Sequence, residues 1–344
     1  MDSLEADSIV GLPFFVQLST LLISGNLLRT FPLSLSFTLG VLLVFGACGP
    51  RRDPSPAVSS QSETLQNDTG ESGGQESSAT PDSPANPPQR PTSMQSSDDG
   101  DVIAAIERWG GIYRMSESHP GMLSVLLLNR SRVVDSELVA IAGQSELVML
   151  DLASTSITNA GLNQLTGLTS LRTLKLSDTR VSDDGMRFVA SCESLEGLAI
   201  NSTDVTDGGL RQLQVNRKLS DLNASKTNID GSAFSAFADN ASLVTLDASL
   251  TKVNDDTVKA IASIESLKTL GLGGTAITNA ALTHLAELPN LTALNVAGSN
   301  MDDRGFEQFS QMTQLRRLGL VKTKWTAAGI EKLRRALPNT RIDF

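Results

Sequence analysis

The chain has 344 residues, a formal net charge of −10, two cysteines and two histidines. Most of the negative charge lies in the first 100 residues, and the remainder lacks the basic surface that nucleic-acid binding needs. Two cysteines cannot build a disulfide framework, and His119 and His284 lie far apart in the sequence and in no metal-ligand motif. We therefore expect no nucleic-acid partner, no metal site and no cofactor.

The N-terminal segment, residues 1–48, contains an apolar run from Pro32 to Ala47 that stops directly before Cys48. Such a run has the length of a signal peptide and is short for a membrane-spanning helix. With small residues ahead of the cysteine, it resembles the lipobox of bacterial lipoproteins. The resemblance implies that cleavage leaves Cys48 as the lipid-bearing residue and that the protein is anchored in the cell envelope.

This segment departs from the lipobox pattern in two places. Phe45 stands where an aliphatic residue is usual, and Arg29 is the only basic residue upstream of the run. A second apolar stretch, Ile9 to Ile23, follows an acidic beginning, so translation from a later start codon is one alternative. Another is an uncleaved inner-membrane anchor, in which Arg51 and Arg52 would hold the repeats in the cytoplasm.

Residues 49–100 are rich in Ser, Pro, Gly and Gln and almost lack large apolar side chains. Such a composition cannot bury enough apolar surface to offset the entropy lost on ordering. We interpret the segment as a disordered tether with a span of about 40 Å.

A 24-residue period dominates the rest of the chain. Leucine occurs at each of positions 123, 147, 171, 195, 219, 243, 267, 291 and 315. Each begins the pattern L-x-x-L-x-L, in which Ile, Val or Ala replaces the last leucine in four repeats. This period and pattern are typical of leucine-rich repeats. They predict nine repeats over residues 123–338, a cap with a helix and an edge strand over 101–122, and a closing strand over 339–344.

Each position of the repeat has a structural interpretation. Alternation predicts a short strand in which Leu174 and Leu176 are buried while Thr173, Lys175 and Ser177 point outward. The threonine at position 9 of the repeat, such as Thr179, fits the turn that follows the strand, where its hydroxyl can bond to the backbone. Helix-capping residue types at position 12 precede apolar residues at helical spacing, which predicts a short outer helix.

The segment Ile157-Thr158-Asn159-Ala160-Gly161-Leu162 is similar to the repeats of eukaryotic F-box proteins and their bacterial counterparts. The resemblance covers residues 123–344 and implies an α/β solenoid. In this right-handed horseshoe a parallel sheet lines the concave face and short helices cover the convex face. It also implies protein or ligand binding rather than chemistry. Residues 51–100 have no apolar helical pattern from which an F-box could form.

The outward strand positions are the default surface for a partner. Positions 5 and 7 of the repeat each form a column of outward side chains along the array. These two columns supply the candidate ligand-binding residues, which are Asp151, Lys175, Asn201, Asn223, Asp247 and Asn295. They could bind an extended peptide, a protein or a glycan. The alternative is a solvated sheet face whose small side chains permit curvature.

The last repeat carries a basic cluster that could meet an anionic partner or simply seal the end of the array. Its members are Arg316, Arg317, Lys322, Lys324, Lys332, Arg334, Arg335 and Arg341. Asp151 and Asp247 lie four repeats apart, about 20 Å, which is too far for paired acid–base catalysis on one bond. We therefore expect a non-catalytic binding scaffold tethered to the cell envelope. The alternatives are a structural envelope protein without a discrete ligand and a cytoplasm-facing, membrane-anchored adaptor.

Overall fold

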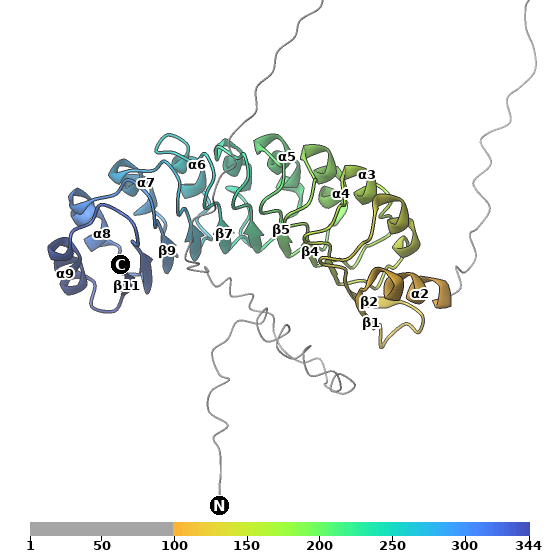
Figure 1. The fold of residues 1–344 in the computed structure, drawn as a ribbon. Coiled ribbons are helices and arrows are strands. Elements are labelled where there is room, and N and C mark those ends of the chain that lie inside the picture. The colour runs from red at the N-terminus through yellow and green to blue at the C-terminus, as the bar shows by residue number, and fades with distance from the viewer. Residues whose placement is uncertain (1–98) are drawn as a thin grey trace, which may run out of the picture. The chain divides into compact units, whose positions relative to one another are not determined.

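The computed structural model describes residues 99–344, drawn in colour in Figure 1. The expected signal segment, Cys48 and nearly all of the expected tether lie outside the described residues. Within the described part of the chain, no helix is both long and apolar enough to cross a membrane.

One 11-stranded sheet runs through the array, with its strands in the order of the chain. The strands β2 to β11 are parallel, whereas β1 pairs antiparallel with β2. In each pair of repeat strands a leucine faces the leucine 24 residues later, as Leu150 faces Leu174. The strands are β1 (Ile112–Met115), β2 (Leu123–Leu127), β3 (Met149–Asp151), β4 (Thr173–Lys175), β5 (Gly197–Ala199), β6 (Asp221–Asn223), β7 (Thr245–Asp247), β8 (Thr269–Gly271), β9 (Ala293–Asn295), β10 (Arg317–Gly319) and β11 (Arg341–Asp343).

Short helices cover the other side of the sheet, and Figure 1 shows the strands along the inner side of the repeat arc. Several of these outer elements are single 3-10 turns rather than α-helices. The α-helices are α2 (Asp99–Trp109), α3 (Asn159–Leu162), α4 (Met186–Ser191), α5 (Asp207–Gln212), α6 (Val258–Ala262), α7 (Leu282–Leu285), α8 (Phe306–Gln311) and α9 (Ala327–Ala336). The 3-10 turns are η1 (Asp135–Ile141), η2 (Asp183–Gly185), η3 (Leu213–Val215), η4 (Ser232–Phe237), η5 (Asn279–Ala281) and η6 (Asp303–Gly305).

A continuous core lies between the sheet and the outer elements. The leucine at position 4 of each repeat, such as Leu174, and its apolar neighbour at position 6, such as Leu176, are buried. Trp325 is also buried, with its ring 5.8 Å from that of Phe309, as its place in an apolar column predicts. Alternation then places positions 3, 5 and 7 on the opposite side of the sheet. The predicted α/β leucine-rich-repeat solenoid is confirmed.

The threonine at position 9 secures the end of each strand. In seven repeats its hydroxyl donates to the carbonyl at position 6 of the same repeat at 2.6 Å, as from Thr179 to Leu176. The structural interpretation of this column is confirmed. Ser299 occupies the same position in its repeat, but its buried hydroxyl has no hydrogen-bond partner.

The residue before this threonine has a left-handed backbone in all nine repeats, with φ between 56° and 71°. Only Gly274 and Gly298 are glycines, and the remaining residues are Arg130, Ser154, Asp178, Ser202, Lys226, Leu250 and Lys322. This conformation could not be predicted from residue type, because these residues share no chemical character. The turn geometry of the coil therefore overrides the local preference for a negative φ.

A second set of hydrogen bonds joins successive repeats on the helix side. The Asp or Asn at position 13 accepts from the backbone N–H at position 12 of the next repeat. It also bonds to the side chain there: Asp135 accepts from the N–H and hydroxyl of Thr158 at 2.8 and 2.6 Å. Asn159 instead donates its amide to the Ser182 hydroxyl at 2.8 Å. We call these contacts the inter-repeat ladder.

The ladder explains the glycines near the start of the outer elements. A Cβ atom on Gly185 would lie 2.7 Å from Oδ1 of Asn159, and one on Gly209 would lie 2.6 Å from Oδ1 of Asp183. The close packing at this position therefore has a specific cause, which is the ladder residue of the preceding repeat.

The ladder is interrupted once within the described array. Gly231 occupies position 13 of its repeat and has no side chain to reach Asn254 in the next. Asn254 instead accepts from the N–H of Thr257 at 3.2 Å, within its own turn. At this junction no side chain at position 13 bridges the two repeats. They are joined by the sheet, by the apolar core and by hydrogen bonds from the Lys252 N–H to the Ile229 carbonyl at 2.8 Å and from the Ser266 hydroxyl to the Asn240 carbonyl at 3.0 Å.

Candidate binding face

The concave face consists of positions 3, 5 and 7 of the repeat strands. The predicted site residues all lie at positions 5 and 7, so position 3, where Thr173 is expected to point outward, adds a third column to this face. Position 3 contributes Val125, Met149, Thr173, Gly197, Asp221, Thr245, Thr269, Ala293 and Arg317. The 24-residue period is the signal that identifies these residues as a third outward column.

Two of the predicted site residues, Asp151 on β3 and Lys175 on β4, form an ion pair. Their side chains are directly opposite in the sheet register, and Lys175 Nζ lies 3.2 Å from Asp151 Oδ2. The pair is largely shielded, with side-chain exposures of 10% for Asp151 and 16% for Lys175. Burial lowers the pKa of Lys175, and the Asp151 carboxylate opposes this shift.

The Asp and Asn residues at position 5 also bond to their own strand ends. One side-chain oxygen accepts from the N–H two residues later, at 3.0 to 3.1 Å, in Asp151, Asn223, Asp247 and Asn295. Asn201, at position 7, accepts from the Ser177 hydroxyl at 2.6 Å. These side chains were predicted as ligand hydrogen-bonding groups, and each already uses part of that capacity within the protein.

Four polar side chains meet at the middle of the face, on β6 and β7. In register, Asp221 faces Thr245 and Asn223 faces Asp247, so the two carboxylates stand at opposite corners of a square. We call these four residues the central quartet. Asp221 is 6% exposed, and its Oδ2 accepts from the Ser220 hydroxyl at 2.6 Å, while its Oδ1 has no partner.

Burial raises the pKa of both carboxyl groups in the central quartet. For Asp221, desolvation outweighs the opposing effect of the Ser220 and Thr245 hydroxyls on its pKa, and the charge of Glu196 adds to the rise. For Asp247, desolvation outweighs the hydrogen bonds from Ser249. Neither carboxylate has an ion-pair partner among the described residues.

The two ends of the face differ from its centre. At the N-terminal end Ile112 pairs with Leu127, and Ile112 is 46% exposed. Met149 is beside Val125 on the next strand, so this end is largely apolar, with the exposed Arg114 of β1 opposite Val125. At the C-terminal end Arg317 occupies position 3 of β10, between Ala293 and Arg341.

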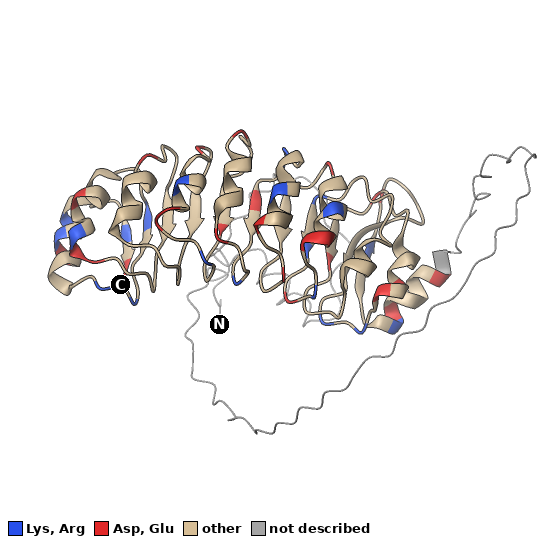
Figure 2. Cartoon of the chain, turned by 90° about the horizontal axis from the view of Figure 1, so that it is seen from above, with Lys and Arg blue, Asp and Glu red and all other residues tan. Residues whose placement is uncertain are grey.

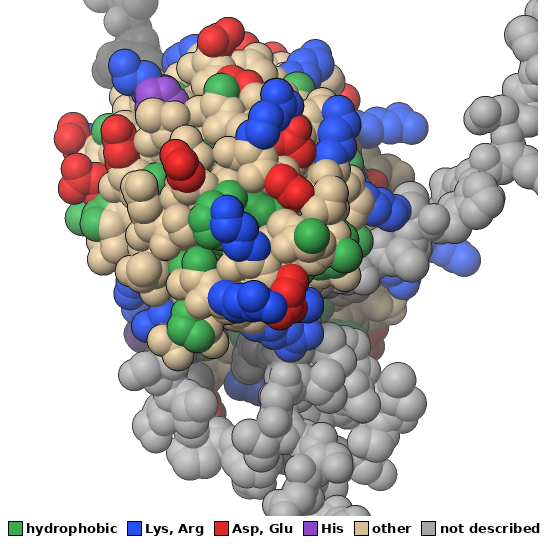
Figure 3. Space-filling view, turned by 90° about the vertical axis from the view of Figure 1, so that its left-hand side faces the viewer, with side chains coloured by type: hydrophobic (Ala, Val, Ile, Leu, Met, Phe, Trp, Pro, Cys, Tyr) green, Lys and Arg blue, Asp and Glu red, His purple; other side chains and the backbone are tan. Residues whose placement is uncertain are grey.

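The basic cluster of the last repeat is spread over several sides of the array end rather than gathered in one patch. Figure 2 shows Lys and Arg on α9, and Figure 3 shows them interspersed with acidic and apolar side chains on this end. Arg335 pairs with Glu331 at 3.4 Å and Arg341 with Asp343 at 2.9 Å, while Lys332 lies 3.9 Å from the centre of the Phe306 ring. These contacts favour the sealing interpretation of the cluster.

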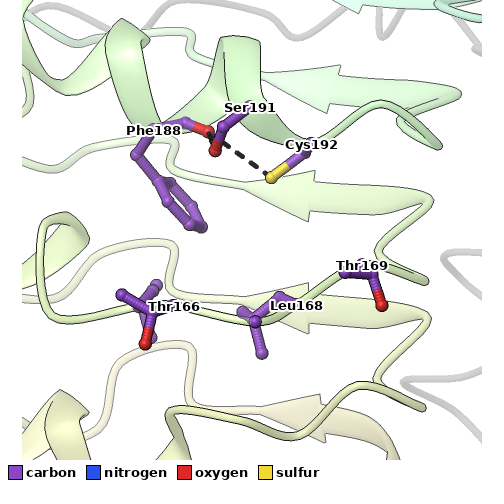
Figure 4. Close-up of a pocket in the computed structure, with 8 residues that line it drawn as sticks. Thr166, Leu168, Thr169, Phe188, Ser191 and Cys192 are labelled. Atoms are coloured by element: carbon purple, nitrogen blue, oxygen red, sulfur yellow. Dashed lines mark hydrogen bonds between the residues drawn. The ribbon is translucent and has the colours of Figure 1, made fainter. Parts of the chain in front are cut away.

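A small hollow of about 240 Å³ lies between the second and third repeats, lined in part by Leu168, Phe188 and Cys192 (Figure 4). The Cys192 thiol donates to the Phe188 carbonyl at 3.5 Å. Burial raises the pKa of this thiol to about 11, so it is protonated at neutral pH. Cys192 is therefore a buried residue of the core.

No group of three or more His, Cys, Asp or Glu side chains in residues 99–344 is arranged to hold a metal ion. A model of the leucine-rich repeat family matches residues 167–190, the length of one repeat. That match falls on the same period that the sheet register follows through all nine coils. The chain is a leucine-rich-repeat protein. Its fold is that of a protein-binding scaffold.

Solved structures similar to this leucine-rich-repeat protein include two internalins of Listeria monocytogenes. Internalin F is 14% identical with a TM-score of 0.40, and the match covers 71% of this chain and 93% of that one. Internalin C2 is 19% identical with a TM-score of 0.45, covering 70% and 90%. The PEPR1–AtPEP1 structure is 19% identical with a TM-score of 0.46, covering 67% of this chain and 35% of that one. No curated protein matches the chain.

Proposed function

We propose that this protein is a non-catalytic scaffold that binds an extended segment of a partner protein across its concave face. The observation that carries the proposal is a contrast between the two sides of the array. On the helix side, polar side chains at positions 12 and 13 satisfy one another through the inter-repeat ladder. On the concave face, Asp221 and Asp247 are shielded from water without an opposite charge, an arrangement that a bound cation would stabilise.

Site-specific photo-crosslinking tests this proposal. The full chain would carry a photoreactive side chain at Asn201 on the concave face or, as a matched control, at the exposed Lys259 on α6. A partner protein that crosslinks saturably from Asn201 and not from Lys259 supports binding through this face. Labelling that is equal at both positions, or that never saturates, would favour a structural envelope protein without a discrete ligand. A carbohydrate adduct at Asn201 would indicate a glycan ligand instead.

We further propose that the protein is tethered to the cell envelope through a lipid on Cys48, because the lipobox-like run ends directly before that cysteine. Incorporation of radiolabelled palmitate by the wild-type chain and not by the Cys48→Ser variant would support this proposal. Absence of label in the wild type would overturn it. Protection of the repeats from protease added outside intact cells, together with membrane association, would favour the cytoplasm-facing anchor.

A further inference from the structure

Two aspartates at the same repeat position have opposite surroundings. Asp151 and Asp247 both occupy position 5 and both accept from the N–H two residues later. Lys175 on the adjacent strand neutralises Asp151 at 3.2 Å, whereas Asn223 and Gly271 are the lateral neighbours of Asp247. The chain itself thus supplies a cation to one shielded carboxylate of this column and none to the other.

Asp221 strengthens this contrast. It is more than nine-tenths buried, it points to the same face as Asp247, and its Oδ1 has no hydrogen-bond partner. Diagonal neighbours on adjacent strands are about 7–8 Å apart, within reach of a long side chain. A guanidinium group has five N–H donors in a planar fork, so one arginine could bond to both carboxylates. The short side chains of Ala199 and Gly271 flank the quartet and leave room above the sheet.

The charge of the face reverses toward the C-terminal end. Arg317 on β10 makes no ion pair among the described residues, while its neighbour Arg341 pairs with Asp343 at 2.9 Å. Three to four strand spacings separate the quartet from Arg317, which is about 14–19 Å. An extended chain covers that distance in about five residues.

We propose that the ligand of the concave face is an extended protein segment in which an arginine or lysine binds at Asp221 and Asp247. An aspartate or glutamate about five residues away binds at Arg317. This inference rests on the proposed function and specifies the partner by its charge pattern. The segment runs across the strands, along the array, so that its side chains meet successive repeats.

Peptide selection tests the inference directly. The full chain would be used to select binders from a random dodecapeptide library, and the affinities of selected peptides would be measured by fluorescence anisotropy. We expect enrichment of a basic residue about five positions from an acidic one. The Asp221→Asn/Asp247→Asn variant should bind these peptides at least tenfold more weakly. Its matched control, Asp239→Asn/Asp256→Asn, removes the same charge from exposed positions outside the concave face and should retain the affinity.

A charge swap makes the test independent of folding defects. Arg317→Glu should weaken binding of the selected peptides, and replacing their acidic residue by lysine should restore it. Thermal unfolding of each variant would show that the fold is kept. The single variant Asp247→Asn provides a second measurement if the double variant is unstable.

The outcomes separate this inference from the proposed function. Selected peptides that lack a basic residue, or that bind the Asp221→Asn/Asp247→Asn variant as tightly as wild type, overturn the charge pattern. If their binding is still lost in Ala199→Trp, which fills the face beside the quartet, the concave-face scaffold stands. Binding that survives Ala199→Trp, or a selection that yields no binder, counts against both.

Discussion

Asp183 of the third repeat holds Thr206 of the fourth with both of its carboxylate oxygens. Oδ1 accepts from the Thr206 backbone N–H and Oδ2 from its hydroxyl, each at 2.7 Å. The Thr206 hydroxyl in turn accepts from the N–H of Gly208 at 3.2 Å, which caps α5. One aspartate therefore links the stacking of two repeats to the start of a helix.

Replacing Asp183 by alanine should lower the free energy of unfolding by about 1–3 kcal/mol, because it leaves the Thr206 N–H and hydroxyl without their acceptor. Asp183→Asn should cost less, since Asn159 makes the equivalent contacts with Ser182. Chemical denaturation measures both. The control is Asp184→Ala, whose side chain is 71% exposed. Equal losses for Asp183→Ala and Asp184→Ala would contradict the stabilising role of the ladder.

The hydroxyl at position 9 should contribute to the stability of the fold only where it has a hydrogen-bond partner. Thr275→Val keeps the shape of the side chain but removes the 2.6 Å hydrogen bond to the Leu272 carbonyl, at a cost of about 1 kcal/mol. Ser299→Ala removes a buried hydroxyl that has no partner, so stability should stay the same or rise. Thermal unfolding of the two variants checks this pair, and a larger loss for Ser299→Ala would reverse the assignment.

Leu250 should be an unfavourable residue at its position. Its φ is 58°, a conformation that costs most residues about 1 kcal/mol, and its side chain is 54% exposed. Leu250→Asn should raise the free energy of unfolding by about 0.5–1 kcal/mol, since asparagine tolerates this conformation. The control is Val215→Asn, which also removes an apolar side chain that is 59% exposed, but without a positive φ. If both variants gain equally, the effect comes from surface polarity and not from the backbone.

The Asp221 carboxyl should make stability depend on pH. Its pKa in the folded protein is raised above the ordinary value of 3.8 by burial, so the folded state holds the proton longer than the unfolded state. Its contribution to stability is therefore greatest below 3.8 and is lost as pH rises from there through the folded-state pKa. Asp221→Asn removes the titratable group and with it this loss of stability at higher pH. The variant should be more stable than wild type at pH 7, and the gain should shrink toward pH 3 in denaturation series; a constant gain would contradict it.

The period accounts for how much of the fold could be predicted. Leu174, Leu176 and Thr179 follow from their columns, because burial and turn bonding repeat every 24 residues. The left-handed residue at position 8 could not be predicted, since Leu250 and Arg130 adopt it through coil geometry alone. The ladder joins residues 23 apart, so its pairs become evident only once the stacking of the coils is known.

The candidate site on the concave face could be predicted less fully from the sequence, for two physical reasons. Lys175 and Asp151 are each polar and outward on their strands, but their pairing depends on lateral register and reduces what they offer a ligand. Asp221 resembles an ordinary surface residue in sequence, and only its burial and its unpartnered oxygen distinguish it. Single-strand alternation predicts which side a residue faces and does not predict which charges remain uncompensated.

The constant repeat length places equivalent residues of the concave face at regular intervals along the array. Each coil advances the sheet by one strand and leaves the positions of the others unchanged, because no insertion disturbs the register from β2 to β10. Gain or loss of a whole repeat between β7 and β10 would shift Arg317 relative to Asp247 by one strand spacing, about 4.8 Å. Duplication of repeats could therefore adjust the length of the proposed ligand segment without altering either charged end.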